Sequence, residues 1–212
     1  MERTPFRYGH VVFDFDGTLV DSLEHSIAAF QRIAPRFHLK LDLDLATART
    51  LPTRELFARM GVRFWNLPRI IRAFQEEAAK DAPGLSLVPG MGDLLVGLAE
   101  RGVRLGILSS NREDAIRACL RAHGVEDRFA FMVGYPKLFG KAKALRRIRK
   151  AHRIDRDALL YVGDEARDVE AAAKAKVASA AVTWGFHAEA LLTAAAPTHL
   201  LRRPGELLEL ES

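Results

Sequence analysis

The second half of the chain alternates short apolar runs with helical patterns, and this alternation restricts the possible folds more than any other feature. The apolar runs are VRLGILSS (103–110), FAFMVG (129–134), ALLYVGD (158–164) and VASAAVTWG (177–185). Helical patterns follow the first three runs, at 112–124, from about 141, and at 166–176. Strands that alternate with helices usually pair in parallel and are covered on both faces. The sequence therefore predicts an α/β fold with a parallel sheet between helices.

The first half breaks this alternation. An apolar run at about 10–15 predicts one more strand, but residues 21–86 contain helical patterns with no convincing strand between them. Pro83 with Gly84 and Pro89 with Gly90 mark the return to the alternating pattern. We therefore expect a core domain formed by 1–20 and 87–212, and a small helical domain, 21–86, inserted into it.

Length and composition agree with a globular chain. The 212 residues fit one domain with a small insert, and 49% of them are hydrophobic. No apolar run approaches the roughly 18 residues that span a bilayer, and the N-terminal residues lack a signal-peptide pattern. We expect a cytoplasmic protein with no membrane partner. The single cysteine, Cys119, lies in a helical pattern and is expected to be a buried structural thiol.

The chain is basic, with a formal net charge of +5 and an isoelectric point near 9.6. Its arginines are scattered except for one cluster, KAKALRRIRKAHR at 141–153, in which Ala144, Leu145 and Ile148 have helical spacing. That spacing predicts an amphipathic helix whose basic side chains face solvent. We therefore expect no nucleic-acid partner, although a positive field is compatible with small anionic substrates.

Polar residues follow several of the predicted strands. They are Asp14, Asp16 and Thr18 after the first strand, Ser109, Ser110 and Asn111 after the second, Lys141 after the third, and Asp164, Glu165 and Asp168 after the fourth. Any one of them could be a turn or helix-cap residue, and the SSN segment could cap the next helix. Together they should meet at the carboxyl edge of the sheet, where α/β proteins bind ligands. Carboxylates, hydroxyls and a lysine at one edge favour Mg²⁺ bound with a phosphoryl group.

Asp14 and Asp16 raise a separate question. Residues two apart in an extended strand share a face, so these two carboxylates should lie close together. Like charges at short distance resist joint ionisation. Something must therefore stabilise the pair or make the two groups different.

These motifs resemble those of a known family. FDFDGTLVDS is similar to the first motif of the haloacid dehalogenase superfamily of phosphohydrolases, and ILSSN, Lys141 and VGDEARDVEAA resemble its second, third and fourth motifs in order. VTWGFHAEALL, PTHLL and PGELLEL further resemble the C-terminal part of phosphoglycolate phosphatase-like members. The resemblance implies a Rossmann-like core and a helical cap, which would be the insert at 21–86.

The resemblance also implies a mechanism, namely Mg²⁺-dependent hydrolysis of a phosphomonoester through an aspartyl-phosphate. Asp14 would be the nucleophile, Asp16 the general acid and base, and Lys141 the group that neutralises nucleophile and phosphate. The implied metal ligands are Asp14, the backbone carbonyl of Asp16, Asp164 and Asp168, with Glu165 joining through water. Thr18, Ser109, Ser110 and Asn111 would bind phosphate or support the site, with Thr18 hydrogen-bonded to Asp16.

Two assignments stay open. The segment PKLFGKAK offers Lys137, Lys141 and Lys143 as the motif lysine, and we prefer Lys141 because it follows Gly140 at the predicted helix start. Arg49 and Arg54, in ARTLPTRELF, are either substrate-facing residues of the cap or solvated surface arginines.

Other functions use similar residues. A sugar-phosphate mutase would have the same site, with a slower-hydrolysing aspartyl-phosphate that transfers its phosphoryl group back. A receiver-like signalling module would also form an aspartyl-phosphate, but its acceptor aspartate should end a middle strand, where this chain has serines. A non-catalytic binding protein would not need every catalytic position. We expect a hydrolase of a small phosphorylated metabolite, phosphoglycolate by family analogy, that is a monomer or homodimer.

Overall fold

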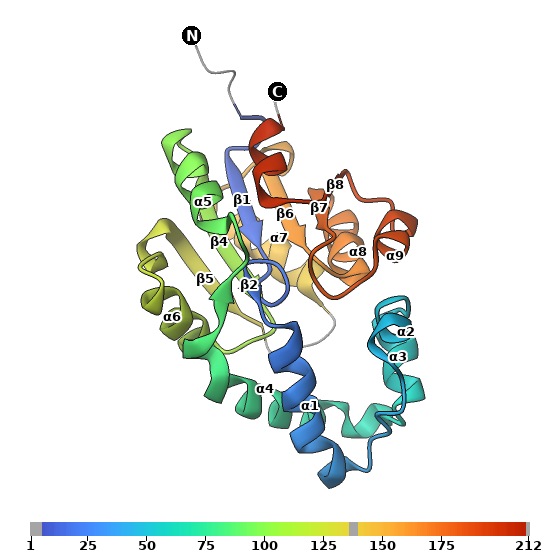
Figure 1. Cartoon of the computed structure of the whole chain (residues 1–212). Helices are drawn as coiled ribbons and strands as arrows, with labels where there is room; N and C mark the ends of the chain where they lie inside the picture. The colour runs from blue at the N-terminus through green and yellow to red at the C-terminus, as the bar shows by residue number, and fades with distance from the viewer. Residues whose placement is uncertain (1–5, 136–139, 211–212) are drawn as a thin grey trace.

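The computed structural model describes residues 6–135 and 140–210. Its main sheet has the order β5-β4-β1-β6-β7-β8, and every neighbouring pair is parallel (Figure 1). The strands are β1 (His10–Phe13), β4 (Arg104–Ser109), β5 (Phe129–Gly134), β6 (Leu159–Gly163), β7 (Ala178–Val182) and β8 (His199–Leu201). The prediction of a parallel sheet is confirmed. β8 was not predicted, because its three residues are too short to give a pattern.

β1 lies inside the sheet and connects its two halves. Val12 is in register with Gly106 of β4 on one side and with Tyr161 of β6 on the other. Val11, Val12 and Phe13 are fully buried, as expected of a strand covered on both faces. The residues that follow β1 therefore emerge between β4 and β6 at the carboxyl edge of the sheet.

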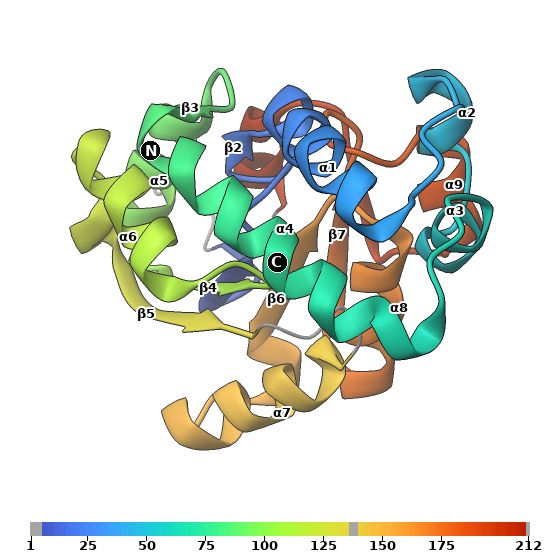
Figure 2. The ribbon, with the colours of Figure 1, turned by 90° about the horizontal axis from the view of Figure 1, so that it is seen from below.

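Helices cover both faces of the sheet. They are α5 (Met91–Glu100), α6 (Glu113–Ala122), α7 (Lys141–His152), α8 (Ala166–Ala175) and α9 (Glu189–Ala194), with 3₁₀ turns η3 (Glu126–Arg128), η4 (Arg156–Ala158) and η5 (Pro204–Glu209). α5 and α6 pack in one hydrophobic cluster with Val11 and Phe13, and α7 and α8 pack in another with Val12. Figure 2 shows α5 and α7 on opposite sides of the strands.

Two predictions from the sequence concern these helices. The apolar residues Ala144, Leu145 and Ile148 of α7 are buried, whereas Arg146 and Arg147 are exposed, so the amphipathic character of the basic helix is confirmed. Cys119 of α6 is fully buried, as expected of a structural thiol.

The segment 21–86, for which we expected a helical insert, lies below the carboxyl edge of the sheet in Figure 1. It contains α1 (Leu23–Phe37), α2 (Leu45–Arg49), α3 (Thr53–Arg59), η1 (Phe64–Asn66), α4 (Leu67–Asp81) and η2 (Ala82–Gly84). α1 and α4 pack together, and the rings of Phe30 and Phe74 stack with centroids 4.4 Å apart. In the view from below, both helices cross in front of the sheet (Figure 2).

A two-stranded antiparallel ribbon joins the insert to the sheet region. β2 (Val20–Asp21) pairs with β3 (Ser86–Leu87), so the chain leaves and returns at adjacent points. The ribbon was not predicted, because two residues per strand are too few to show alternation. It coincides with the predicted boundaries near residues 20 and 86, although the division into two domains stays a prediction. Among the helices of the described residues, none combines the length and apolar character that crossing a membrane requires.

Candidate active site

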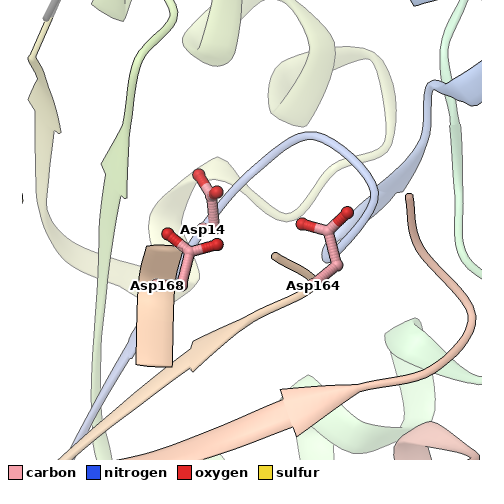
Figure 3. A group of neighbouring side chains, drawn as sticks. All are labelled: Asp14, Asp164 and Asp168. Atoms are coloured by element: carbon pink, nitrogen blue, oxygen red, sulfur yellow. The ribbon is translucent and has the colours of Figure 1, made fainter. Parts of the chain in front are cut away.

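Three buried carboxylates meet at the carboxyl edge of the sheet. Asp14 follows β1, Asp164 follows β6, and Asp168 lies in the first turn of α8 (Figure 3). Each offers one carboxylate oxygen, and these oxygens all lie within 4.8 Å of one another. The pairing of β1 with β6 brings them together, because the backbone N–H of Asp14 continues the ladder to the carbonyl of Val162 at 2.8 Å.

Lys141 supplies the positive charge of this cluster. Its Nζ lies 2.5 Å from Oδ2 of Asp14 and 2.7 Å from Oδ1 of Asp168, and its side chain is 3% exposed. Lys141 begins α7 directly after Gly140, whose φ of 119° is in the glycine-favoured region. Lys143 is exposed, and Lys137 lies outside the described residues.

The charge balance of the cluster perturbs its pKa values. Burial raises the pKa of Asp14 to about 7, with a further contribution from Asp168 and in spite of the nearby Lys141. Burial and then the Glu165 and Asp14 carboxylates raise the pKa of Asp164. Burial alone would lower the pKa of Lys141, but Asp14 and Asp168 outweigh it and the pKa is raised. Three carboxylates around one ammonium group therefore carry an unfavourable excess of negative charge.

A hard divalent cation fits this cluster. Mg²⁺ prefers carboxylate oxygens and is usually held by one or two carboxylates together with substrate phosphate. The cluster offers three carboxylates from two strand ends and one helix, and its excess negative charge favours a cation over an empty site.

Asp16 lies in a different environment from Asp14. It is partly exposed, and its Oδ2 accepts a hydrogen bond from Nδ2 of Asn111 at 2.7 Å. Asp14 is buried and its oxygens are occupied by Lys141 and by the backbone N–H of Phe15 at 2.8 Å. Burial raises the pKa of Asp16, which favours the protonated form. The two carboxylates thus avoid facing the same partners, which answers the question that their spacing raised.

We expected Thr18 to hydrogen-bond to Asp16, but its hydroxyl bonds to a different carboxylate. Its hydroxyl donates to Oδ1 of Asp164 at 3.1 Å, and the side chain is fully buried. The loop turns sharply at Gly17, whose φ is 64°, and this turn carries Thr18 toward β6 rather than back to Asp16. A Cβ at Gly17 would collide with the Asp164 carboxylate, so glycine also provides the space for it. Phe186 N–H fixes the other oxygen of Asp164 at 2.7 Å.

The serine motif lies at the end of β4, beside β1. Ser109 is fully buried, and its Oγ accepts the backbone N–H of Asn111 at 3.0 Å. The carbonyl of Ser110 accepts a hydrogen bond from the side-chain amide of Gln75 in α4. The alternative that this motif caps the next helix is wrong, since Arg112 occupies the cap position and α6 begins at Glu113.

Glu165 was expected to join the metal ligands through water, and in the structure its carboxylate is bonded to protein groups. It forms an ion pair with Arg167, and its Oε2 accepts a hydrogen bond from Thr53 of α3 at 2.7 Å. Burial would raise the pKa of Glu165, but Arg167 outweighs it and lowers the pKa to about 2. Asp168 accepts from the backbone N–H of Glu165 at 3.2 Å, which completes a capping box at the start of α8.

The two arginines of the insert behave differently. Arg49 donates from Nε to the carbonyl of Phe186 at 2.9 Å and from Nη2 to that of Gly185 at 3.0 Å. It therefore binds the loop between β7 and α9. Arg54 is exposed. Thr53, Gln75 and Arg167 were not predicted from the sequence as site residues. Only Arg167, within the fourth motif, carried a signal that could have drawn attention to it.

Comparison with known proteins identifies the family. The family model for haloacid dehalogenase-like hydrolases matches residues 11–182, which is more than half of the chain. The chain belongs to the haloacid dehalogenase-like hydrolases. A curated relative, phosphoglycolate phosphatase from Synechococcus elongatus, is 38% identical over 201 residues, covering 94% of this chain and 95% of the relative. The expectation of a haloacid dehalogenase-type phosphatase is confirmed at the level of the family.

Solved structures show the same fold as this haloacid dehalogenase-like hydrolase. The crystal structure of a predicted phosphatase from Clostridium acetobutylicum has a TM-score of 0.82 at 24% identity, covering 95% of this chain and 97% of that one. A haloacid dehalogenase-like family hydrolase from Streptococcus pneumoniae has a TM-score of 0.80 at 22% identity, covering 96% and 98%. At these identities the likeness concerns the fold alone.

Proposed function

We propose that this haloacid dehalogenase-like hydrolase is a Mg²⁺-dependent phosphomonoesterase that forms an aspartyl-phosphate on Asp14. The observation that carries the proposal is the difference between two neighbouring carboxylates. Asp14 lies in the buried cluster with Lys141, whereas Asp16 is partly exposed and held by Asn111. One carboxylate is thus suited to be a nucleophile and the other to transfer protons.

The metal would be held by the Asp14 and Asp164 carboxylates and the backbone carbonyl of Asp16. Asp168 would be a further ligand or would support the site, since its Oδ1 also accepts hydrogen bonds from Lys141 at 2.7 Å and Tyr161 at 3.2 Å. When bound, Mg²⁺ supplies positive charge that reduces repulsion between the anionic nucleophile and the anionic phosphate.

The reaction would proceed in two displacements at phosphorus. In the first, an Asp14 oxygen attacks phosphorus as the bond to the alcohol oxygen breaks, and Asp16 donates its proton to the leaving alkoxide. In the second, Asp16 takes a proton from water, which displaces Asp14 and releases inorganic phosphate. The pKa of Asp16, raised by burial, favours the protonated acid that the first step needs.

Groups at neighbouring strand ends would hold the phosphate. Lys141 balances the charge of the nucleophile and phosphate together, and the Ser109 hydroxyl with the backbone N–H groups near Ser110 and Asn111 would bind phosphoryl oxygens. Thr18 would support the site through Asp164, to which its hydroxyl donates.

The helical insert would act as a cap over this edge of the sheet. Its contacts with the core through Arg49, Thr53 and Gln75 support this role. The substrate would be a small phosphorylated metabolite, and phosphoglycolate is the first compound to test because relatives carry that name. We further propose a cytoplasmic monomer or homodimer.

The first experiment is release of inorganic phosphate from a panel of phosphomonoesters, with and without Mg²⁺. The proposal expects turnover only with the divalent cation and without a bisphosphate activator. An isomerised sugar phosphate that accumulates without net phosphate release would indicate a mutase instead. Full activity in excess chelator would contradict the proposed role of the metal.

A further inference from the structure

A cavity of about 300 Å³ lies between the helical insert and the active site. Asp16 and Asp164 line it on the catalytic side. Much of its remaining wall is apolar and comes from the insert, including Ile27 and Phe30 of α1, Phe57 of α3, and Ile71 and Phe74 of α4. The cavity is thus continuous with the carboxylate that we propose as the proton donor to the leaving alcohol.

The insert that lines the cavity is in contact with the sheet region. Thr53 of α3 donates to Glu165 at 2.7 Å, and Gln75 of α4 donates to the carbonyl of Ser110. These two contacts lie on different helices of the insert. Phe30 packs against Phe57 and Phe74, and all three rings line the cavity and stay only partly buried, so they present apolar surface to it.

The cavity offers little to balance a second anionic group on the substrate. In the proposed reaction Asp16 is protonated and Asp164 would hold the metal, so Glu165 is the acidic lining residue that keeps its own charge. The basic lining residues, within the described part of the chain, are Lys40 and Arg167. Arg167 already forms an ion pair with Glu165, and Lys40 is exposed to solvent. A carboxylate on the alcohol part of a substrate would therefore lie among apolar side chains, and burying it there is costly.

We propose that this cavity binds the alcohol part of the substrate, and that this part is an apolar alkyl or aryl group. The inference rests on the proposed phosphomonoesterase function and names the substrate class for that site. The size agrees, because a dry cavity of about 150 Å³ holds benzene, and this one is about 300 Å³. The phosphate would lie at Asp14, with the ester oxygen at Asp16 and the apolar group between α1, α3 and α4.

The test is a series of n-alkyl phosphates from ethyl to hexyl, measured with Mg²⁺ beside phosphoglycolate. Their leaving groups are nearly equally basic, so differences in kcat/KM report on the alkyl chain. We expect kcat/KM to rise about twofold to fourfold for each methylene that becomes buried, and hexyl phosphate to exceed phosphoglycolate. A flat series, or a preference for phosphoglycolate over hexyl phosphate, would overturn the inference.

A charge substitution locates the effect. Ile71→Lys places an ammonium group at the cavity wall and should flatten the alkyl series while raising kcat/KM for phosphoglycolate. Val96→Lys is the matched control, since Val96 is an exposed residue of α5 outside the cavity lining. An alkyl series that is equally steep in both variants would show that the chain binds elsewhere, and the assignment to this cavity would be wrong.

Binding gives a readout that does not depend on turnover. Hexylphosphonate cannot be hydrolysed and should bind the Mg²⁺-loaded wild-type protein at least tenfold more tightly than ethylphosphonate by calorimetry; equal affinities would count against the cavity. The two proposals also fail differently. If no phosphomonoester releases phosphate, the proposed function fails, whereas hydrolysis of short esters without a chain-length effect overturns only the substrate class.

Discussion

Asn111 donates a hydrogen bond from its side-chain amide to Asp16, with 2.7 Å between Nδ2 and Oδ2. This contact links the end of β4 to the loop after β1 and orients the carboxylate that we propose as the general acid. In the proposed reaction Asn111 would therefore be a positioning residue, in addition to its expected backbone contribution to phosphate binding.

We expect Asn111→Ala to lower kcat for alkyl phosphates about tenfold, a part of the 10² to 10⁴-fold that general acid–base catalysis typically contributes. An aryl phosphate should lose much less, because its leaving oxygen needs little protonation. The measurement is the dependence of kcat on leaving-group pKa in both proteins. Arg112→Ala, at the exposed next residue, is the control. Equal losses for alkyl and aryl esters would contradict the positioning role.

The Asp14→Asn and Asp16→Asn variants should lose different steps of the proposed reaction. Asp14→Asn removes the nucleophile, so no covalent intermediate should form. Asp16→Asn keeps the nucleophile, and an activated aryl phosphate should phosphorylate Asp14 slowly and leave a persistent aspartyl-phosphate. Intact mass or borohydride trapping detects it. A phosphoryl group found on Asp16 would show that the two roles are reversed.

Lys141→Met should abolish most activity, with an expected loss of at least about 10²-fold, because the nucleophile and phosphate lose their counter-charge. The buried Asp14 and Asp168 carboxylates also lose a partner, so the melting temperature without Mg²⁺ should fall. Lys143→Met is the control, since Lys143 is exposed. Steady-state kinetics and thermal unfolding of both variants decide between the two lysines.

Removal of divalent cations should stop turnover, and added Mg²⁺ should restore it. Binding to the folded protein at 100 times Kd stabilises it by about 2.7 kcal/mol, which raises the melting temperature by roughly 5–10 °C in a chain of this size. Asp164→Asn should reduce that shift strongly. A Mg²⁺-induced shift as large in the variant as in the wild type would remove Asp164 from the site.

Cys119 should be unreactive in the folded protein. Burial raises the pKa of its thiol to about 11, so the thiolate is a minor species at pH 8 and forms only as the pH rises through that value. Ellman's reagent should label the native chain very slowly at pH 8 and the unfolded chain at once. Rapid native labelling at pH 8 would show that the thiol is accessible.

Most strands of the sheet could be predicted from the sequence, because short apolar runs such as 103–110 and 158–164 alternate with helical patterns. β8, of three residues, and the β2–β3 ribbon gave no pattern of their own, since their pairing depends on contacts distant in sequence. Local patterns cannot report such contacts.

The candidate site was also predictable only in part. The convergence of Asp14, Asp164 and Asp168 could be expected from the sequence, because all three follow predicted strands and so lie at the carboxyl edge of the sheet. The hydrogen-bond partners of individual side chains could not be predicted in this way. Thr18 was expected to hold Asp16, but the backbone turn at Gly17 directs its hydroxyl to Asp164, and Asn111 holds Asp16. Contacts from the insert, such as Gln75 with Ser110, depend on how the insert and the sheet region meet in space.

The β2–β3 ribbon has a consequence for how this architecture can diversify. Because Val20 and Leu87 are paired neighbours, the chain departs and returns through one narrow neck. Lengthening or exchanging the segment between β2 and β3 leaves the connections among the strands of the main sheet as they are. Additional loop length in that segment has only a small entropic effect on folding. Exchanging the insert through this neck would thus keep the sheet connections, but it would also remove the contacts that Thr53 and Gln75 make with Glu165 and Ser110.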